Sequence, residues 1–298
     1  MNRRLFFQSP ALLVGPSMGL LNGCTDTAGL DYVASDAPSY APETKPRPVV
    51  WVLGSGGPRG FVHIGVLKAL DELGLKPDLI VGASVGSLVG ALYACGFNGL
   101  QLEEFAMDLN LLSVVRLNIG GKERFDGSAI ADLVNERVQG RKIEQLAIPF
   151  ACAVLDQNSN TTQLFNRGNT GLAVQASCAI TQAFAPVRIK GRLWQDPDWV
   201  TPMPVRLAKQ LGGSKVLAVD ASAHESRAPA GAESYRASDL KKRRLIAADT
   251  AVADLTLHPD FGYWVSVKTE FRINAMKQGY LHTMERAQAL RDLHRRSG

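Results

Sequence analysis

Two short apolar runs in this chain each pass through a glycine-rich turn into a helical pattern. The run 49–53 leads into the glycine-rich stretch 54–60, and the run 79–81 leads into a G-x-S-x-G sequence at 82–86. Uninterrupted apolar runs of this length are typical of strands that are buried on both faces of a parallel sheet. Strands that alternate with helices in this way predict an α/β domain with a covered, parallel sheet.

The rest of the chain continues this alternation. Further strands are expected at 150–154 and 216–219, and helices are expected at 61–73, 88–94, 129–138, 205–211 and 264–295. The chain has 298 residues, of which 46% are hydrophobic and 20% are charged, and this is enough apolar material for one large core. We therefore expect a single domain over residues 48–298.

The N-terminal segment has the layout of a secretory signal, with two arginines in front of an apolar stretch. Residues 21–24, Leu-Asn-Gly-Cys, resemble the lipobox of bacterial lipoproteins, in which cleavage before the cysteine leaves a lipidated residue. We therefore expect a signal peptide at 1–23 and lipidation of Cys24. The alternative is an ordinary signal peptide followed by an incidental cysteine.

A tether and an envelope location are expected from the residues after Cys24. Residues 24–47 are rich in Pro, Ser, Asp and Ala and lack periodicity, which is typical of a flexible linker. Thr25 follows the cysteine, which resembles an outer-membrane rather than an inner-membrane signal of Gram-negative bacteria. The expected protein is lipid-anchored to a membrane surface of the cell envelope and faces the periplasm.

Charge and cysteine content argue against a nucleic-acid partner, a disulfide framework and a metal site. The formal net charge is +5, but the basic residues are scattered, with their densest run at 241–244, which favours a solvated face or attraction to anionic lipid over a nucleic-acid partner. Besides Cys24, the cysteines are Cys95, Cys152 and Cys178, an odd and widely spaced set that indicates buried free thiols. No residues have metal-ligand spacing, so we expect no metal and no other cofactor.

Ser84 stands between Gly82 and Gly86, the two glycines of the G-x-S-x-G turn. A serine in this position is either a nucleophile on a sharp strand-to-helix bend, where flanking side chains do not fit, or part of an ordinary connecting turn. The motif alone does not decide between these two interpretations.

The glycine-rich stretch 54–60 has to be compared with phosphate-binding loops. It lacks the Lys-Ser/Thr pair of a P-loop, and Arg59 occupies the place of the third glycine in the dinucleotide fingerprint. Such a loop directs several backbone N–H groups to one point beside a helix N-terminus, which is how an oxyanion hole is built. Because Pro58 has no N–H, the candidate donors are Gly56, Gly57, Arg59 and Gly60.

The glycine loop and the serine turn, one helix apart, together resemble the patatin-like phospholipase family. That family combines G-G-x-R-G, here 56–60, with G-x-S-x-G, here 82–86, and with a later aspartate in D-G-G or D-G-A. The resemblance covers residues 48–222 and includes LHPDFGYWVSV at 257–267. It implies a three-layer α/β/α fold with a mainly parallel central sheet. It also implies a serine hydrolase that acts on phospholipids or other acyl esters without a cofactor.

The resemblance further implies a Ser-Asp dyad, in which Ser84 attacks the ester carbonyl and an aspartate acts as general base. Two prolines at 202 and 204 resemble those that follow the family's D-G-G, and counting back from them leads to Asp196 as the base. The two glycines after this aspartate are replaced here by Pro and Asp. The second replacement, Asp198, is the alternative base.

Two other functions stay open. The replaced glycines, together with A-I-T-Q at 179–182 in place of the family's A-I-P-G, favour a catalytically impaired lipoprotein that binds lipid or serves as a scaffold. An esterase of the α/β-hydrolase type would use a Ser-Asp-His triad, with His258 as the histidine. His63, on the helix after the glycine loop, is interpreted as a packed or hydrogen-bonded helix residue rather than a catalyst.

Overall fold

The structure is a computed structural model that describes residues 30–43, 45–110, 114–119 and 121–295. Its sheet contains β1 (Arg47–Leu53), β2 (Leu79–Ala83), β3 (Phe150–Asp156), β4 (Thr161–Phe165), β5 (Val187–Ile189), β6 (Arg192–Gln195), β7 (Gly213–Val219) and β8 (Leu255–Leu257). Its α-helices are α1 (Phe61–Glu72), α2 (Val85–Cys95), α3 (Gly99–Asp108), α4 (Ser128–Arg137), α5 (Thr170–Ser177), α6 (Val205–Gln210), α7 (Arg236–Thr250), α8 (Thr269–Glu285) and α9 (Ala287–His294). Within these residues, no helix has both the length and the apolar composition needed to cross a membrane. The expected signal peptide, 1–23, and Cys24 lie outside the described residues.

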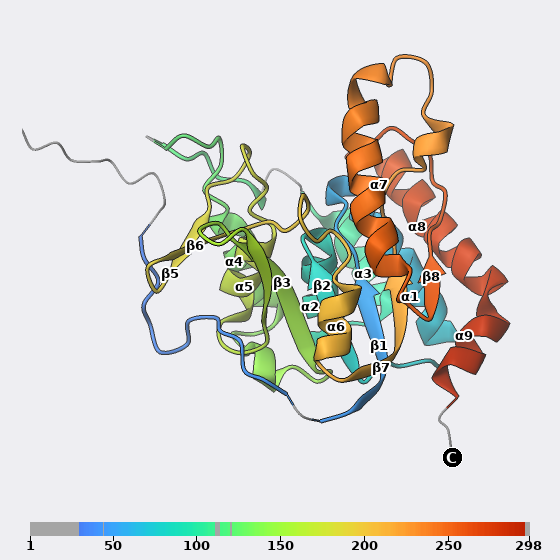
Figure 1. The fold of residues 1–298 in the computed structure, drawn as a ribbon, viewed down its shortest axis with the longest axis horizontal. Helices are drawn as coiled ribbons and strands as arrows, with labels where there is room; N and C mark the ends of the chain where they lie inside the picture. Colours follow the sequence, from blue (N-terminus) through green and yellow to red (C-terminus); the bar gives the residue numbers. More distant parts are fainter. Residues whose placement is uncertain (1–29, 44, 111–113, 120, 296–298) are drawn as a thin grey trace, which may run out of the picture.

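One sheet organises the molecule. Hydrogen bonds connect its strands in the order β5-β6-β3-β2-β1-β7-β8, and β4 also pairs with β3. The pairs from β3 through β2, β1 and β7 to β8 are parallel, whereas β4, β5 and β6 pair antiparallel. Figure 1 shows the long parallel strands in the middle of the molecule, with β5 and β6 to one side.

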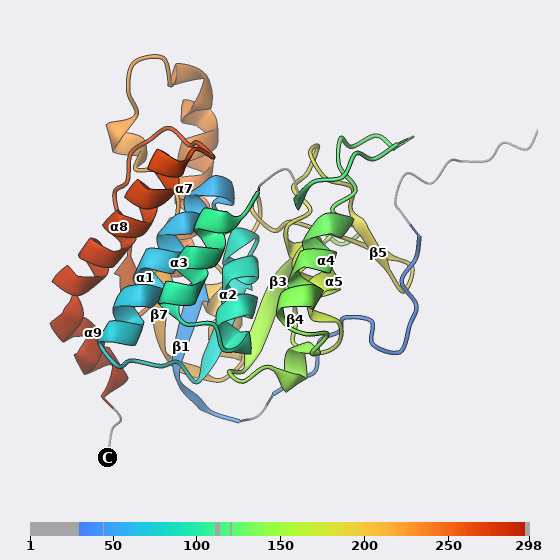
Figure 2. The ribbon, with the colours of Figure 1, turned by 180° about the vertical axis from the view of Figure 1, so that it is seen from behind.

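Helices cover both faces of the sheet. Figure 1 shows α6 and α7 in front of the sheet, and Figure 2 shows α1, α2, α3 and α8 on the opposite face. In β1, Val50 and Val52 pack in the cluster that includes α6, whereas Trp51 and Leu53 pack in the cluster on the other face. All of the apolar run 49–53 is buried because each face of the strand has its own helical layer. The three-layer α/β/α fold is therefore confirmed.

Several elements differ from the sequence-based expectations. The helix expected at 264–295 is two helices, α8 and α9, which are separated at Arg286, and its first five residues are not helical. The strands β5 and β8 have only three residues each, which is too short for an alternating pattern to be visible. Helix α7 is so polar that only Ile246 and Asp249 are buried, so it has no apolar stripe that would predict it.

The segment expected to be a flexible tether packs against the domain where the structure describes it. Tyr32 N–H donates to Arg188 O at 3.0 Å, and Tyr32 forms an isolated bridge with Ile189 of β5. Ala37 is buried, and β1 starts at Arg47, within the expected tether. The tether prediction is wrong for this part of the chain, because backbone pairing with an edge strand leaves no periodic pattern in the sequence.

Strands β2 and β6 meet end to end along one edge of β3. Ala153 of β3 pairs with β4 on one side and with the last residue of β2 on the other. Two residues further along, Leu155 again pairs with β4 and takes the last residue of β6 on its other side. Because a strand residue has only two sides, β2 and β6 share one edge of β3. The residues that follow these two strand ends, Ser84 and Asp196, are therefore brought face to face.

Candidate active site

Ser84 lies on a sharp turn between β2 and α2. Its backbone has φ 52° and ψ −126°, a conformation that non-glycine residues rarely adopt and that costs about 1–3 kcal/mol. Ser84 N–H donates to Ser177 Oγ at 2.9 Å, and Ser177 Oγ donates to Ala153 O of β3 at 2.7 Å. These hydrogen bonds attach the strained turn to the central sheet.

The two glycines of the turn are required because of the space around them. A Cβ atom on Gly86 would lie 2.1 Å from Leu53 O, and a Cβ atom on Gly82 would lie 2.4 Å from the Cα atom of Ser87. Both distances are far below van der Waals contact, and the atoms concerned belong to the backbone. The G-x-S-x-G sequence therefore forms a tightly packed bend with Ser84 at its apex, and not a loose connection.

Asp196 follows β6 and faces Ser84. Ser84 Oγ donates a hydrogen bond to Asp196 Oδ2 at 2.5 Å, although the two residues are 112 positions apart in the sequence. The other carboxylate oxygen, Oδ1, accepts the backbone N–H of Asp198 at 2.9 Å. Ser84 and Asp196 are each only 3% exposed to solvent. The structure thus brings the two residues of the expected dyad together as a buried, hydrogen-bonded pair.

The surroundings raise the pKa of Asp196 from its ordinary value of 3.8 to about 7. Burial is the main cause, because the ionised carboxylate loses its hydration, and the neighbouring carboxylate of Asp198 acts in the same direction. The hydrogen bonds from Ser84 and from the Asp198 backbone, and the positive charge of Lys242, partly oppose this rise. A carboxyl group with a pKa near neutrality is suited to accept a proton and return it at neutral pH.

Asp198, the alternative base, is directed to other partners. Lys242 Nζ lies 2.6 Å from Asp198 Oδ1, and Ser55 Oγ donates a hydrogen bond to the same oxygen. The contact of Asp198 with Asp196 is made by its backbone N–H. Among the described contacts, the carboxylate that reaches the hydroxyl of Ser84 is that of Asp196.

The glycine loop follows β1 and is anchored beside the serine turn. Ser55 N–H donates to Pro202 O at 2.9 Å, and Arg59 N–H donates to Gly56 O at 3.1 Å, closing the 3₁₀ turn Gly57–Gly60. The Arg59 amide, one of the expected oxyanion donors, is therefore engaged within the loop. The first N–H groups of a helical turn have no partner inside the turn, so Gly56 and Gly57 are the expected donors whose amides the turn itself does not use.

Two side chains brace the loop from behind. Arg59 donates from its guanidinium to Tyr263 O at 2.7 Å, which connects the loop to the segment before α8, and burial lowers the pKa of Arg59. His63 Nε2 lies 2.8 Å from Gly54 O, and burial lowers the pKa of His63 to about 4, so its ring is neutral at neutral pH. Both contacts are to backbone carbonyls. The interpretation of His63 as a packed, hydrogen-bonded residue is confirmed.

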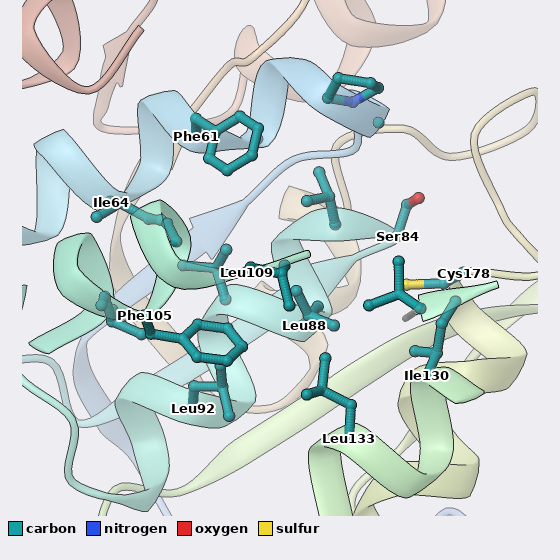
Figure 3. A pocket seen from close by; sticks show the side chains of 18 of the residues that line it. Phe61, Ile64, Ser84, Leu88, Leu92, Phe105, Leu109, Ile130, Leu133 and Cys178 are labelled. Atoms are coloured by element: carbon teal, nitrogen blue, oxygen red, sulfur yellow. The ribbon is translucent and has the colours of Figure 1, made fainter. Parts of the chain in front are cut away.

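An apolar cavity of about 340 Å³ opens beside Ser84. The glycine loop forms part of its wall, and α1, α2, α3 and α4 supply most of the remaining side chains. Figure 3 shows Ser84 at one side of the cavity and Phe105 and Ile64 on the far side. Leu88 and Leu92 of α2, the helix that follows Ser84, lie between them. A cavity of this size and lining fits an apolar chain rather than a polar group.

His258, the histidine of the alternative triad, has other neighbours. Its Nε2 atom lies 3.0 Å from Ser222 O and 3.7 Å from Asp220 Oδ2, and its ring stacks on the ring of His224. None of the contacts described for this part of the chain joins His258 to Ser84. The arrangement around Ser84 is that of a serine paired with a carboxylate.

The remaining titratable groups near the site are thiols. Cys152 and Cys178 are buried and free, as expected, whereas Cys95 is only partly buried. Burial raises the pKa of Cys152 to about 12 and the pKa of Cys178 well above its ordinary value, so both thiols are neutral. In the described ranges, no group of three or more His, Cys, Asp or Glu is arranged to hold a metal ion.

Comparison with known proteins decides the family. The sequence model of the family described as Patatin-like phospholipase matches residues 51–209, which is more than half of the chain. The chain belongs to the patatin-like phospholipase family.

Two relatives that resemble this chain are longer proteins. An uncharacterized NTE family protein of Mycobacterium tuberculosis is 32% identical over 219 residues, which is 72% of this chain and 59% of that protein. Patatin-like phospholipase domain-containing protein 6 of Homo sapiens is 31% identical over 185 residues, which is 59% of this chain and 14% of that protein. The chain thus spans only part of the length of these relatives.

A solved structure shares the fold of this patatin-like domain. The crystal structure of VipD from Legionella pneumophila matches with a TM-score of 0.50 and 14% sequence identity, covering 83% of this chain and 68% of VipD. At this identity the likeness concerns the fold alone.

Three side chains that shape the site are not found by sequence reasoning. Ser177 lies in AVQASCAI, a segment that resembles the family, but nothing in that segment reveals its bond to the Ser84 backbone. Ser55 lies in the glycine-rich stretch 54–60, and Lys242 lies in a basic run on α7. The contacts of Ser55 and Lys242 with Asp198 depend on how three separate elements pack against one another, and no local sequence pattern predicts this packing.

Proposed function

We propose that this chain is a serine acyl hydrolase of lipid esters, of the phospholipase A or lysophospholipase type. The observation that carries the proposal is the hydrogen bond of 2.5 Å between Ser84 Oγ and Asp196 Oδ2 beside an apolar cavity. A buried hydroxyl paired with a carboxylate of pKa about 7 has the features of an activated nucleophile and its base. The cavity supports an ester with a long apolar acyl chain.

In the proposed reaction, Ser84 Oγ attacks the carbonyl carbon of the ester while its proton passes to Asp196 Oδ2. The tetrahedral intermediate collapses when the bond to the alcohol oxygen breaks, and Asp196 returns the proton to that leaving oxygen. The acyl group is then esterified to Ser84. A water molecule attacks the same carbon, again giving its proton to Asp196, and Ser84 leaves with that proton as the fatty acid is released.

The oxyanion of each tetrahedral intermediate requires donors in a fixed position. The glycine loop supports this role because Gly57 and Gly60 line the cavity together with Ser84, and Gly56 and Gly57 are the first residues of the turn that uses the Arg59 amide. Removing one such donor costs about 2.7–4 kcal/mol of transition-state stabilisation in other enzymes. In this proposal the loop therefore matters nearly as much as the base.

The lipobox-like sequence at 21–24 supports the further proposal that Cys24 is lipidated and holds the enzyme at a membrane surface of the cell envelope, with Thr25 favouring the outer membrane. Asp31 is the first residue with a described contact to the domain, because its carboxylate accepts the Gly191 N–H at 2.9 Å. Fully extended, the chain from Cys24 to Asp31 spans at most about 25 Å. Such an anchor would keep the catalytic domain close to its lipid substrates.

The proposal is tested with a fluorophosphonate probe and the variant Ser84→Ala. The probe phosphorylates activated serines, so the wild-type protein should be labelled at Ser84, and hydrolysis of phospholipids and lysophospholipids should fall by more than about 10³-fold in the variant. Ser214→Ala is a matched control, because Ser214 is exposed on β7 and lies outside the cavity lining.

Two results separate this function from its alternatives. Turnover that survives Ser84→Ala would contradict the dyad. A folded wild-type protein that is neither labelled nor active on the lipid panel would instead support the lipid-binding or scaffolding function.

A further inference from the structure

Asp198 supplies a second carboxylate at the catalytic base, at a position where the family motif has glycine. The backbone N–H of Asp198 donates to Asp196 Oδ1 at 2.9 Å, a contact that a glycine would make equally well. The position has no positive φ that would require glycine. The Asp198 carboxylate is therefore an addition of this chain to the site, and it has to be explained by what it binds.

The Asp198 carboxylate joins three separate elements. Lys242 Nζ on α7 lies 2.6 Å from Asp198 Oδ1, and Ser55 Oγ on the glycine loop donates to the same oxygen. The side chains of Lys242 and Asp198 are only 17% and 19% exposed. Ser55 is itself fixed, because its N–H donates to Pro202 O at 2.9 Å. The ion pair thus links α7, the loop of the base and the loop that carries the oxyanion donors.

The same ion pair controls the charge around the base. The carboxylate of Asp198 raises the pKa of Asp196, and the ammonium group of Lys242 lowers it. The thiols of Cys152 and Cys178 face Asp196 from β3 and from the end of α5, but both are neutral. Arg59 from the glycine loop interacts with Asp198 and with Asp239 of α7, so its charge is shared with a second acid. Lys242 is the cation that contacts Asp198 directly.

We propose that Lys242 is a positioning residue of this active site. It holds the Asp198 carboxylate against Ser55 and thereby fixes the position of Asp196 relative to the glycine loop. The inference rests on the proposed function, since it assigns a role around Asp196 as base. Lys242 neutralises a carboxylate that would otherwise repel the charge of Asp196.

The test measures the rate of Ser84 labelling by the fluorophosphonate, and kcat/KM for a lysophospholipid, from pH 5 to pH 9. Lys242→Met keeps the apolar stem and removes the charge, so the pH of half-maximal rate should rise by about one unit. Asp198→Asn keeps the backbone and removes the repelling charge, so this pH should fall. The double variant removes both charges and should return close to the wild-type pH.

Two further variants complete the test. Lys242→Arg retains the charge and should restore most of the wild-type profile. Arg244→Met is the matched control, because Arg244 is exposed on the same helix and removing it changes the net charge equally. Its profile should coincide with that of the wild type.

The outcomes separate this inference from the proposed function. Ser84→Ala and Asp196→Asn test the dyad, and if they abolish activity while Lys242→Met leaves the pH profile unmoved, only the role of Lys242 is overturned. Shifts of Lys242→Met and Asp198→Asn in the same direction would also overturn it. Removing opposite charges should shift the pH of half-maximal rate in opposite directions, whereas a loss of local structure alone would not. A wild-type protein without labelling or turnover would overturn both. If Lys242→Met does not fold, Asp198→Asn alone decides through the direction of its shift.

Discussion

Replacing Asp196 by Asn should destroy activity and at the same time stabilise the protein, increasingly so as the pH rises. The pKa of Asp196 is about 7 in the folded protein, compared with an ordinary value of 3.8. Below about pH 4 the carboxyl is protonated in both states and contributes nothing. As the pH rises, the unfolded chain ionises first, so the folded state loses stability relative to it until about pH 7, above which both states are ionised.

The magnitude follows from the size of this difference. Each pH unit corresponds to about 1.4 kcal/mol, so the folded state is less stable by about 4 kcal/mol at pH 8 and by about 2 kcal/mol at pH 5. Asn removes the ionisation. Its side-chain oxygen can accept the Asp198 N–H, and its amide group can donate to Ser84 Oγ, so both hydrogen-bonding positions of the carboxyl stay satisfied.

Urea unfolding followed by circular dichroism at pH 5 and pH 8 checks this prediction. The difference in the free energy of unfolding between Asp196→Asn and the wild type should increase by about 2–3 kcal/mol between the two pH values. Turnover should fall by about 10³–10⁴-fold in the variant. Asp132→Asn is the control, since the side chain of Asp132 is 64% exposed and its variant should show no such increase. An Asp196→Asn variant whose stability difference is the same at both pH values would refute the reasoning.

Two further predictions concern the serine turn and the N-terminus. Gly86→Ala places a Cβ atom 2.1 Å from Leu53 O, so it should lower the free energy of unfolding by more than about 2 kcal/mol and slow the labelling of Ser84; a variant with the wild-type melting temperature would contradict the required close packing. Cys24→Ala should prevent lipid attachment and move the protein from the membrane fraction to a soluble or uncleaved form, and unchanged mass and fractionation would exclude lipidation.

The sequence predicts the parts of the site that depend on local geometry. Ser84 is recognised because the bend between a buried strand and a helix needs glycine on both sides, and the spacing of the loop at 54–60 is equally local. Asp196 is predicted from its distance to two prolines, although the sequence pattern gives no sign of β6, the strand that delivers it. The choice between Asp196 and Asp198 becomes visible only where one carboxylate meets Ser84 and the other meets Lys242.

The parts that sequence reasoning misses depend on contacts between distant segments. Strand β6 has four residues, only one of them buried, so it has no apolar signal of its own and exists because β3 offers it an edge. Lys242 looks like a solvent-facing charge in a basic run, and its partner lies 44 residues away. Tyr32 lies in a segment without periodicity and pairs with a strand that is itself only three residues long.

Helix α2 begins directly after Ser84 and supplies part of the cavity wall. Ser84 caps its N-terminus, and Val85, Leu88 and Leu92 line the cavity along one side of it, as Figure 3 shows for the two leucines. At 1.5 Å per residue, Leu92 lies about 10 Å beyond Val85 along the axis. In the proposed reaction, the position of each α2 side chain relative to Ser84 fixes which part of the acyl chain it contacts. A displacement of α2 would move Ser84 and these side chains together, so the preferred acyl-chain length depends on the side chains opposite the helix.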